Sequence, residues 1–384
     1  MQLSVIILNY NVRYFLELCV LSVQNAVQNI DAEIIVIDNN SQDDSCEMMK
    51  KRFPNLKLIQ NKENSGFPKG NNIGVEVAQG EYICILNPDT VVAEDTFEKI
   101  LNFVTSSAVE NDKIGIVGVK LIDGTGNFLP ESKRGIPTPF VAFTKITGLY
   151  KIFPKTFGKY YAQHLSENET GKVEILVGAF MLMRRGLYNE IGGFDEDCFM
   201  YSDDIDLSYM ALKKGKSNYY FHETSVIHYK GESTVKDGTY MKRFREAMNF
   251  FYKKHFSVSL LFSVFMEMGI VFFSFVKMFQ GKPKPKLSPE KYVLVSDNEI
   301  LEEQLEKQFD REVKLQKMVN SFSKEAATEI IFDQNYLDFK TIIQAFETNK
   351  KNKFTFKILP ESSGFLIGSN SSFDRGEIVQ ITYF

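Results

Sequence analysis

Asp89 lies where a buried strand is predicted to end. Residues 83–86 are all apolar, which predicts a strand buried on both faces, and Asn87-Pro88 ends it because proline has no backbone donor. In open α/β sheets ligands bind at this edge, and a carboxylate there suits a divalent cation that carries a diphosphate. The alternative is that Asp89 only caps a helix that begins near Val92.

A second group of carboxylates consists of the neighbours Asp203, Asp204 and Asp206. Like charges this close repel one another, so the group persists only where it is exposed or useful. The alternative role is structural, because acidic side chains favour the first turn of a helix and apolar residues follow here at helical spacing. Both roles are compatible, since a helix start can also present a carboxylate that accepts a proton.

Polar residues also follow two earlier predicted strands: Asn9, Tyr10 and Asn11 after the run 3–8, and Asp38 and Asn40 after the run 33–37. A carboxylate at a strand end can accept hydrogen bonds from a base or a ribose. The alternative is that Asp38 builds a plain turn.

The segment 64–72 is rich in Gly and Asn and is predicted to lead into a helix. Such a loop offers backbone donors and a helix N-terminus to a phosphate, with Lys69 as a nearby cation. A plain turn is the alternative. The candidate residues of this loop are Asn64, Gly66, Phe67, Lys69 and Asn72.

The elements that must position these residues alternate between strand and helix over residues 1 to about 120. The predicted strands are 3–8, 33–38, 56–59 and 83–86, and the predicted helices between them are 13–28, 44–53 and one that follows residue 72. This alternation implies an α/β fold with a parallel sheet and right-handed crossovers.

These segments resemble the nucleotide-sugar half of family 2 glycosyltransferases, and most closely their rhamnosyltransferase-like branch. The resemblance rests on Val5-Ile-Ile-Leu-Asn-Tyr-Asn11, Val36-Ile-Asp-Asn-Asn-Ser41, Glu63-Asn-Ser-Gly-Phe67 with Gly70-Asn-Asn72, and Asn87-Pro-Asp-Thr90. It continues through Gly178-Ala179, Gly192-Gly-Phe-Asp-Glu196, Phe199-Met-Tyr-Ser-Asp-Asp-Ile-Asp-Leu207 and His228-Tyr-Lys-Gly-Glu-Ser-Thr234, and so covers residues 1 to about 255.

The resemblance implies a GT-A fold, with a mostly parallel central sheet flanked by helices, and an inverting, metal-dependent hexosyltransferase. Such an enzyme would move rhamnose or another hexose from a dTDP- or UDP-sugar to a hydroxyl of a glycan acceptor, expected to be lipid-linked, in cell-surface polysaccharide synthesis. The rival from another class is a non-catalytic sugar-nucleotide scaffold or sensor at the membrane. The retention of both Asp89 and Asp204 argues against that rival.

The resemblance also assigns roles to the carboxylates. Asp204 is expected to be the general base and Asp203 to orient the acceptor, whereas Asp206 would hold the helix start or a basic neighbour. Asn87-Pro88-Asp89 stands where the family has Asp-x-Asp, so Asp89 would hold Mg²⁺ or Mn²⁺ together with His228. Imidazole suits Mn²⁺ better than Mg²⁺, and a structural histidine is the alternative for His228.

The remaining roles carried over by the resemblance concern the donor and the acceptor. The residues expected at the donor nucleotide are Asn9, Tyr10, Asn11, Asp38, Asn40, Asn64, Gly66, Phe67, Lys69, Asn72 and Asn87. Those expected at the sugar and the acceptor are Gly178, Ala179, Phe199 and Tyr201.

Composition narrows the class of protein. The 44% of hydrophobic and 24% of charged residues are typical of a globular chain, and the net charge of -4 argues against a nucleic-acid partner. The four cysteines lack metal-binding spacing and are expected to be reduced, which favours the cytosol. The N-terminus has no basic region before its first apolar run, so no signal peptide is expected.

The chain is predicted to form a glycosyltransferase domain over residues 1–240, divided into a nucleotide-sugar half (1–120) and an acceptor half (121–240) with a lid at 128–169. Residues 241–280 contain a basic aromatic helix and the apolar run 257–278, expected to be a monotopic or re-entrant membrane helix; a true span and a buried soluble helix are the alternatives. We therefore expect a peripheral or monotopic protein on the cytoplasmic face of the cell membrane, with the inner leaflet as a partner and oligomeric state left open.

A stiff charged linker at 281–290 precedes a small α/β domain over residues 291–384. This domain resembles the Rossmann-like domain of polyprenyl-phosphate sugar transferases. Ser296-Asp297-Asn298 replaces its glycine-rich phosphate turn, so docking or regulation competes with nucleotide binding as its role.

Overall fold

The structure, a computed structural model, describes residues 1–106, 113–138, 141, 158–229, 238–256, 289–319, 322, 327–350, 354–369 and 376–382. The predicted apolar helix at 257–278, most of the linker and much of the predicted lid lie outside these residues. Among the helices that are described, none is long and apolar enough to cross a membrane.

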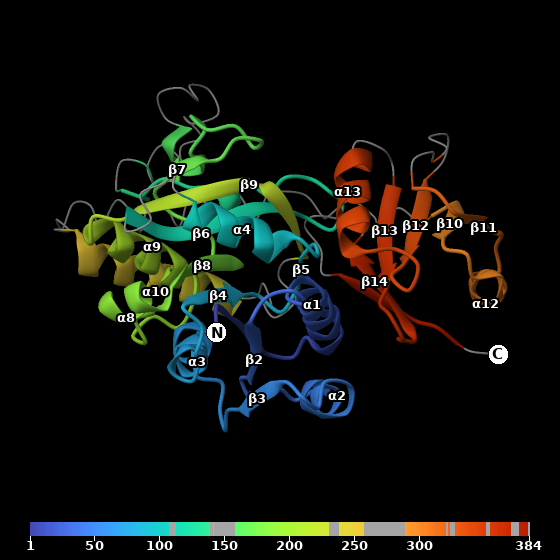
Figure 1. The fold of residues 1–384 in the computed structure, drawn as a ribbon, viewed down its shortest axis with the longest axis horizontal. Coiled ribbons are helices and arrows are strands. Elements are labelled where there is room, and N and C mark those ends of the chain that lie inside the picture. The colour runs from blue at the N-terminus through green and yellow to red at the C-terminus, as the bar shows by residue number, and fades with distance from the viewer. Residues whose placement is uncertain are drawn as a thin grey trace.

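The N-terminal domain is built on one large mixed sheet (Figure 1). Within the described residues its strands lie in the order β3-β2-β1-β4-β8-β6-β9-β5, and β7 also pairs with β9. The strands are β1 (Leu3–Asn9), β2 (Ala32–Asp38), β3 (Lys57–Gln60), β4 (Tyr82–Leu86), β5 (Thr90–Val91), β6 (Ile114–Ile122), β7 (Gly171–Val173), β8 (Phe180–Arg184) and β9 (Ser217–His228).

The predicted parallel alternation is confirmed for the first four strands, since β3, β2, β1 and β4 all run parallel. The expectation of a mostly parallel sheet is correct only for this half. Strand β8 pairs antiparallel with both β4 and β6, and β5 and β7 pair antiparallel with β9. The sheet as a whole is therefore mixed.

Helices cover both faces of this sheet because successive side chains of each strand point to opposite faces. Val5 and Ile7 of β1 pack in the cluster that includes α1, α2 and α4, whereas Ile6 and Leu8 pack in the cluster that includes α8 and α9. The helices are α1 (Arg13–Ala26), α2 (Ser45–Arg52), α3 (Gly66–Glu76), α4 (Thr96–Thr105), η2 (Pro130–Ser132), η3 (Gly158–Tyr161), α8 (Arg185–Glu190), α9 (Asp203–Lys213) and α10 (Gly238–His255).

The C-terminal unit has a sheet of its own, with the strand order β11-β10-β12-β13-β14-β15 in its described part. The first four strands in this order run parallel, and β14 and β15 add antiparallel pairs. Its elements are β10 (Lys291–Val295), α12 (Glu299–Phe309), β11 (Val313–Gln316), β12 (Thr328–Asp333), α13 (Phe339–Asn349), β13 (Phe354–Leu359), β14 (Phe365–Ser369) and β15 (Glu377–Gln380).

Polar side chains at the carboxyl edge of this second sheet form hydrogen bonds with one another. The Ser296 hydroxyl after β10 donates to Asp333 Oδ2 at 2.7 Å, and the Asn335 amide donates to Asp333 Oδ1 at 2.8 Å. Ligands bind at this edge in open α/β sheets, but here the side chains bind one another. Docking, regulation and nucleotide binding all stay predictions for the C-terminal unit.

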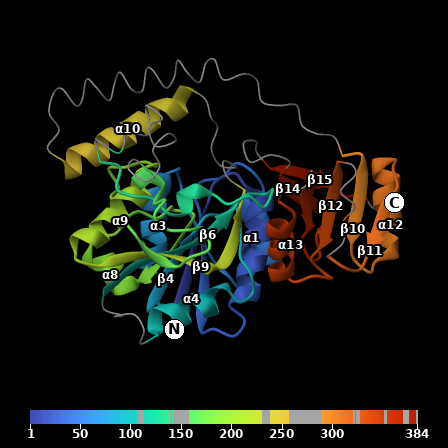
Figure 2. The same cartoon turned by 90° about the horizontal axis from the view of Figure 1, so that it is seen from above.

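The C-terminal unit packs directly on the N-terminal domain, with α13 against α1 and β9 (Figures 1 and 2). One buried apolar cluster draws Phe15 and Leu18 from α1, Ile227 from β9, and Ile342 and Phe346 from α13. An interface this apolar resembles a continuous core, so the two units are expected to move together.

The loop after β5 caps a helix of the other unit. The two carboxylate oxygens of Glu94 accept hydrogen bonds from the backbone N–H groups of Phe339 and Lys340 at 2.7 and 2.8 Å. These are orphan donors of the first turn of α13, and a carboxylate there also interacts favourably with the helix dipole.

Glu94→Ala is expected to destabilise the full chain by about 1 kcal/mol, the usual effect of losing a helix cap, which lowers the melting temperature by roughly 2 °C. Thermal unfolding measures this change, and hydrogen exchange at the start of α13 locates it. Glu98→Ala is the matched control, because Glu98 is an exposed residue of α4 with the same charge. Equal melting temperatures for the two variants would contradict the proposed cap.

Candidate active site

Strand pairing brings the two predicted metal ligands together. Strand β4 ends at Leu86, and the chain turns through 87–89 into β5, where Thr90 pairs with His228 of β9. As a result, Asp89 Oδ1 lies 3.3 Å from His228 Nε2, and both side chains are buried. The alternative role of Asp89 as a helix cap is wrong, because Asp89 precedes a strand and α4 begins only at Thr96.

The donor atoms of this pair fit a divalent cation. Asp89 Oδ1 and His228 Nδ1 are buried and make no hydrogen bond, and Asn87 Nδ2 lies 3.4 Å from His228 Nε2. A buried carboxylate oxygen without a donor is costly unless a cation or water satisfies it. No group of three or more His, Cys, Asp or Glu side chains in the described part of the chain could enclose a metal, so the remaining ligands would be phosphate oxygens and water.

The dipeptide Gly178-Ala179 connects the turn that carries Asp89 with the acidic pair, Asp203 and Asp204. The Asn87 backbone N–H donates to Ala179 O at 3.0 Å, and the Gly178 N–H donates to Asp204 Oδ2 at 3.1 Å. A Cβ atom at residue 178 would lie 3.4 Å from the Asp204 Cβ, an ordinary van der Waals distance, so this contact does not by itself require glycine.

Asp203 and Asp204 begin α9, and both are buried, so the expectation that such a cluster could persist by exposure is wrong. The structural and functional roles remain compatible, because the pair does form the first turn of the helix. Burial, with the neighbouring charge of Asp204, raises the pKa of Asp203 to about 7. This carboxyl can therefore change its protonation state near neutral pH.

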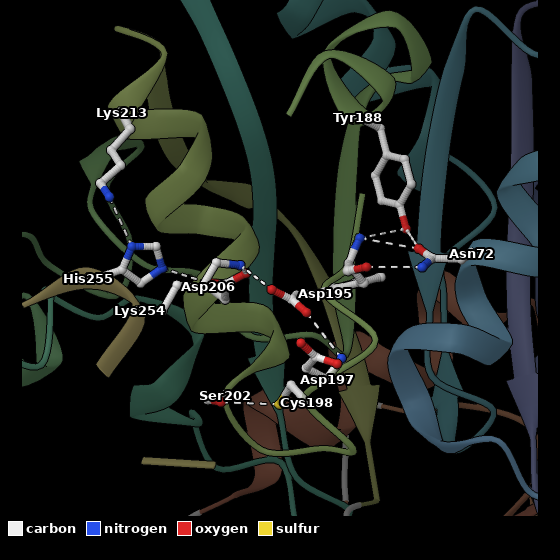
Figure 3. A network of polar contacts seen from close by, with 11 residues as sticks. Asn72, Tyr188, Asp195, Asp197, Cys198, Ser202, Asp206, Lys213, Lys254 and His255 are labelled. Atoms are coloured by element: carbon white, nitrogen blue, oxygen red, sulfur yellow. Dashed lines mark hydrogen bonds and ion pairs between the residues drawn. The ribbon is translucent and has the colours of Figure 1, made fainter. Parts of the chain in front are cut away.

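Asp206 holds basic neighbours, as predicted (Figure 3). Its carboxylate accepts from Lys254 Nζ at 2.9 Å and lies 2.5 Å from His255 Nε2, and Lys254 also reaches Asp195 at 2.5 Å. His255 Nδ1 lies in turn 3.0 Å from Lys213 Nζ. These contacts fasten the end of α10 to the helix that carries the acidic pair.

The exits of β1 and β2 form a polar corner. Asn9 Nδ2 donates to Asp38 Oδ1 at 2.8 Å and to Ser41 Oγ at 3.0 Å, and Asp38 Oδ2 accepts from Ser41 N at 2.9 Å. Asn11 and Asn40, with φ angles of 56° and 65°, take the left-handed backbone that asparagine tolerates. Asp38 thus builds a turn, and its contact with a nucleoside, like those of Asn9, Tyr10, Asn11 and Asn40, stays a prediction.

Asn39 organises the neighbouring loop, although it was not among the predicted site residues. Its Nδ2 donates to Asn64 Oδ1 at 2.9 Å and to Gly66 O at 3.2 Å, and its Oδ1 accepts from Asn61 Nδ2 at 3.0 Å. The only sequence signal was its place between Asp38 and Asn40. The side chain therefore joins the exit of β2 to the loop that leads into α3.

The predicted loop 64–72 is wrong beyond Ser65, because α3 already begins at Gly66, and the start of this helix packs on the segment that precedes α9. The Phe67 N–H donates to Phe199 O at 3.0 Å, and a Cβ at Gly66, whose φ is +85°, would lie 2.8 Å from the Phe199 ring. The Phe199 ring is 39% exposed, with the Arg243 guanidinium 4.7 Å from its centroid. Tyr201 has a φ of 79°, an uncommon conformation for an aromatic residue.

Two candidates in α3 differ in exposure. Lys69 is exposed, and its contact with a phosphate stays a prediction. The Asn72 amide instead donates to Phe194 O at 3.0 Å and to Glu196 Oε1 at 2.9 Å, and its Oδ1 accepts from the Tyr188 hydroxyl (Figure 3). Asn72 therefore fastens α3 to the loop after α8.

Sequence reasoning also missed Arg134, which ion-pairs with Asp204. It lies in the proline-rich stretch that was predicted to be a lid, and nothing in its spacing distinguished it from Lys133. The contact depends on tertiary structure, because 70 residues separate the two partners.

Residues 4–192 match the family model described as glycosyl transferase family 2. The N-acetylglucosaminyl-diphospho-decaprenol L-rhamnosyltransferase of Mycobacterium tuberculosis is 26% identical over 218 residues, which cover 53% of this chain and 68% of that protein. The minor teichoic acid biosynthesis protein GgaB of Bacillus subtilis is 33% identical over 117 residues, 29% of this chain and 13% of that protein.

Solved structures with a similar course of the chain include TarS 1-349 of S. aureus in complex with UDP-GlcNAc. The TM-score is 0.45 at 18% identity, over 67% of this chain and 68% of that chain. The family match covers strands β1 to β4, Asp89 and the Gly178-Ala179 link, and ends before α9 and His228. Residues 4–192, within this N-terminal α/β domain, therefore form a glycosyl transferase family 2 domain.

Proposed function

We propose that this chain is an inverting, metal-dependent hexosyltransferase that uses a dTDP- or UDP-sugar and extends a lipid-linked glycan at the cytoplasmic face of the membrane. The observation that carries the proposal is the link through Gly178-Ala179. Ala179 O accepts from the backbone N–H of Asn87, which adjoins the Asp89–His228 pair, and the Gly178 N–H donates to the Asp204 side chain. A site for a diphosphate-bound cation and a proton acceptor are thereby fixed relative to each other, as direct displacement requires.

Each group has one role in the proposed reaction. Asp89 and His228 hold the cation, with Mn²⁺ favoured over Mg²⁺ by the imidazole ligand. When bound, the cation stabilises the negative charge that develops on the leaving diphosphate. Asp204 takes the proton of the acceptor hydroxyl, and Asp203 orients that acceptor. A single displacement from the opposite face of the sugar inverts the anomeric carbon.

The donor and acceptor classes draw support from the relatives. The name of the mycobacterial relative describes rhamnosyl transfer to a diphospho-decaprenol lipid, and that of the B. subtilis relative describes teichoic acid synthesis. A lipid-linked acceptor would explain the apolar run 257–278 as a membrane anchor. Rhamnose or another hexose is the proposed sugar.

The test is binding and hydrolysis of a panel of UDP-, dTDP- and GDP-sugars by the full chain, with Mn²⁺, with Mg²⁺ and with a chelator. We expect one donor to bind in a metal-dependent manner, followed by slow release of its nucleotide with water as the acceptor. Tight binding without release, even with added lipid-linked glycan, would support the sensor role instead. Failure to bind any donor would reject both functions.

A further inference from the structure

We infer that Arg134 is a positioning residue that fixes the orientation of the Asp204 carboxylate for proton transfer. The inference rests on the proposed function, because it assigns Asp204 the role of general base. Arg134 itself would touch neither the donor nor the acceptor. It would act by deciding which Asp204 oxygen is free.

Arg134 is anchored at both its backbone and its guanidinium. Its N–H and C=O both pair with Ile175 at 2.9 Å, in an isolated bridge between two segments. Its Nη2 donates to Asp204 Oδ2 at 2.5 Å and to Leu176 O at 2.8 Å. Because the residue is only 9% exposed, neither contact competes with bulk water.

The guanidinium is a permanent charge in this position. Arginine keeps its proton in proteins, and although burial opposes the charge, the neighbouring Asp204 carboxylate raises the pKa of Arg134 above its usual value. Only Nη2 contacts the carboxylate, while Nε is buried without a hydrogen bond, and the bond from the same Nη2 to Leu176 O fixes the direction of this single contact. Arg134 can therefore orient a carboxylate in addition to balancing its charge.

The contacts leave one side of the carboxylate available. Asp204 Oδ2 accepts from Arg134 Nη2 and from Gly178 N, whereas Oδ1 accepts from Ile205 N alone, at 2.8 Å. A carboxylate oxygen has about two lone-pair sites, so Oδ2 is fully used and Oδ1 keeps one. The geometry therefore assigns Oδ1 as the atom that takes the proton.

The bonds that form and break in this step balance. The acceptor O–H bond breaks, and its proton passes to Asp204 Oδ1. The oxygen electron pair forms the new bond to the anomeric carbon. The bond from that carbon to the donor phosphate breaks, and its electron pair leaves with the nucleoside diphosphate.

A purely structural role for Arg134 makes a different prediction. Two buried neighbouring carboxylates repel each other, and a guanidinium beside them lowers the cost of burial. Loss of that stabilisation would lower the melting temperature without changing turnover by the folded enzyme. Loss of orientation would reduce the rate and alter its pH dependence.

The test compares Arg134→Met and Arg134→Lys with the wild-type full chain, using nucleotide release from the best donor of the panel with water as acceptor. We expect Arg134→Met to lower kcat by about 10- to 100-fold with the donor dissociation constant within about twofold. Arg134→Lys keeps the charge but not the planar guanidinium, so its kcat should lie between those of the wild type and Arg134→Met. Arg134 lowers the pKa of the neighbouring Asp203, so without this cation the acid limb of the Arg134→Met profile should move upward.

Other titratable groups face this pair and are unchanged in the variants: Asp203 from α9, and Glu131 and Tyr160 beside the guanidinium. Lys254 and His255 of α10 contact Asp206 instead. Arg134 also lowers the pKa of Asp203, so a shift of the acid limb reports loss of the Arg134 charge beside both carboxyls, whereas a fall in kcat at constant donor affinity reports loss of orientation.

Lys133→Met is the matched control, because Lys133 is the adjacent buried cation and donates to Leu165 O at 2.7 Å and Ala162 O at 3.2 Å. It should lose stability and keep the wild-type pH profile. In an Asp204→Asn background, Arg134→Met should lower the rate no further. If folded Arg134→Met or Arg134→Lys keeps the wild-type kcat and acid limb, the role of Arg134 is overturned and the proposed function is not. If the wild-type chain neither binds nor hydrolyses any donor, the proposed function is overturned, and the role of Arg134 with it.

Discussion

Asp204→Asn is expected to slow nucleotide release by about 10³-fold while the donor dissociation constant stays within about twofold. The amide oxygen can still accept from Gly178 N and Arg134, but the NH2 group then faces Ile205 N and the Arg134 charge loses its partner, so thermal unfolding must show that the variant is folded. The amide cannot take the proton of the acceptor hydroxyl. The measurements are steady-state release and calorimetric binding of the same donor.

Asp203→Asn is the natural comparison for this variant. Asp203 is equally buried but is expected only to orient the acceptor, so its replacement should cost less. The Asp204 charge is one of the causes that raise the pKa of Asp203, so in Asp204→Asn the pKa of Asp203 should fall from about 7. If Asp204→Asn weakens donor binding as much as it slows release, the assignment of Asp204 as the base fails.

Asp89→Asn is expected to abolish the metal dependence of donor binding. A neutral amide is a much weaker ligand for Mg²⁺ or Mn²⁺ than a carboxylate, and within the described residues no third acidic, His or Cys side chain completes the site. Donor affinity in Mn²⁺ should then approach that in chelator. Nucleotide release should fall by about 10²- to 10³-fold, because the leaving diphosphate loses its electrostatic partner.

The opposite change provides the control for this prediction. Asn87→Asp adds a second carboxylate beside His228, because the Asn87 amide nitrogen already lies 3.4 Å from His228 Nε2. It should strengthen metal binding, since affinity rises with the number of charged ligands. Titration with Mn²⁺ separates the two variants. A site whose Mn²⁺ affinity responds to neither substitution would not be the metal site.

The sequence was sufficient to predict the donor half of the fold because each of its strands is short, apolar and separated by a helix. The predicted strand 33–38 and helix 13–28 correspond to β2 and α1 within two residues at each end. Pairing in the acceptor half could not be predicted in this way. Strand β5 has only two residues, and β8 enters between β4 and β6 although its sequence position is after both.

The candidate site shows the same division. Asp89 and His228 were paired by resemblance, and the β5–β9 ladder does bring them together. Arg134 and Asn39 were missed because their roles depend on distant partners, 70 residues away for Arg134 and 22 to 27 residues away for Asn39, which leave no local pattern. The docking of α13 was missed for the same reason, since apolar positions of a helix do not identify the surface that will cover them.

The contacts of α1 with the C-terminal unit have a consequence for how the protein is made. Tyr14, near the start of this helix, accepts from Gln380 Nε2 at 2.6 Å, and its ring lies 4.8 Å from that of Phe365. Ribosomes deliver the chain from its N-terminus, at about 5–20 residues per second. The surface of α1 is therefore covered only after β14 and β15 have been synthesised. During that interval the nascent chain exposes apolar side chains that chaperones bind.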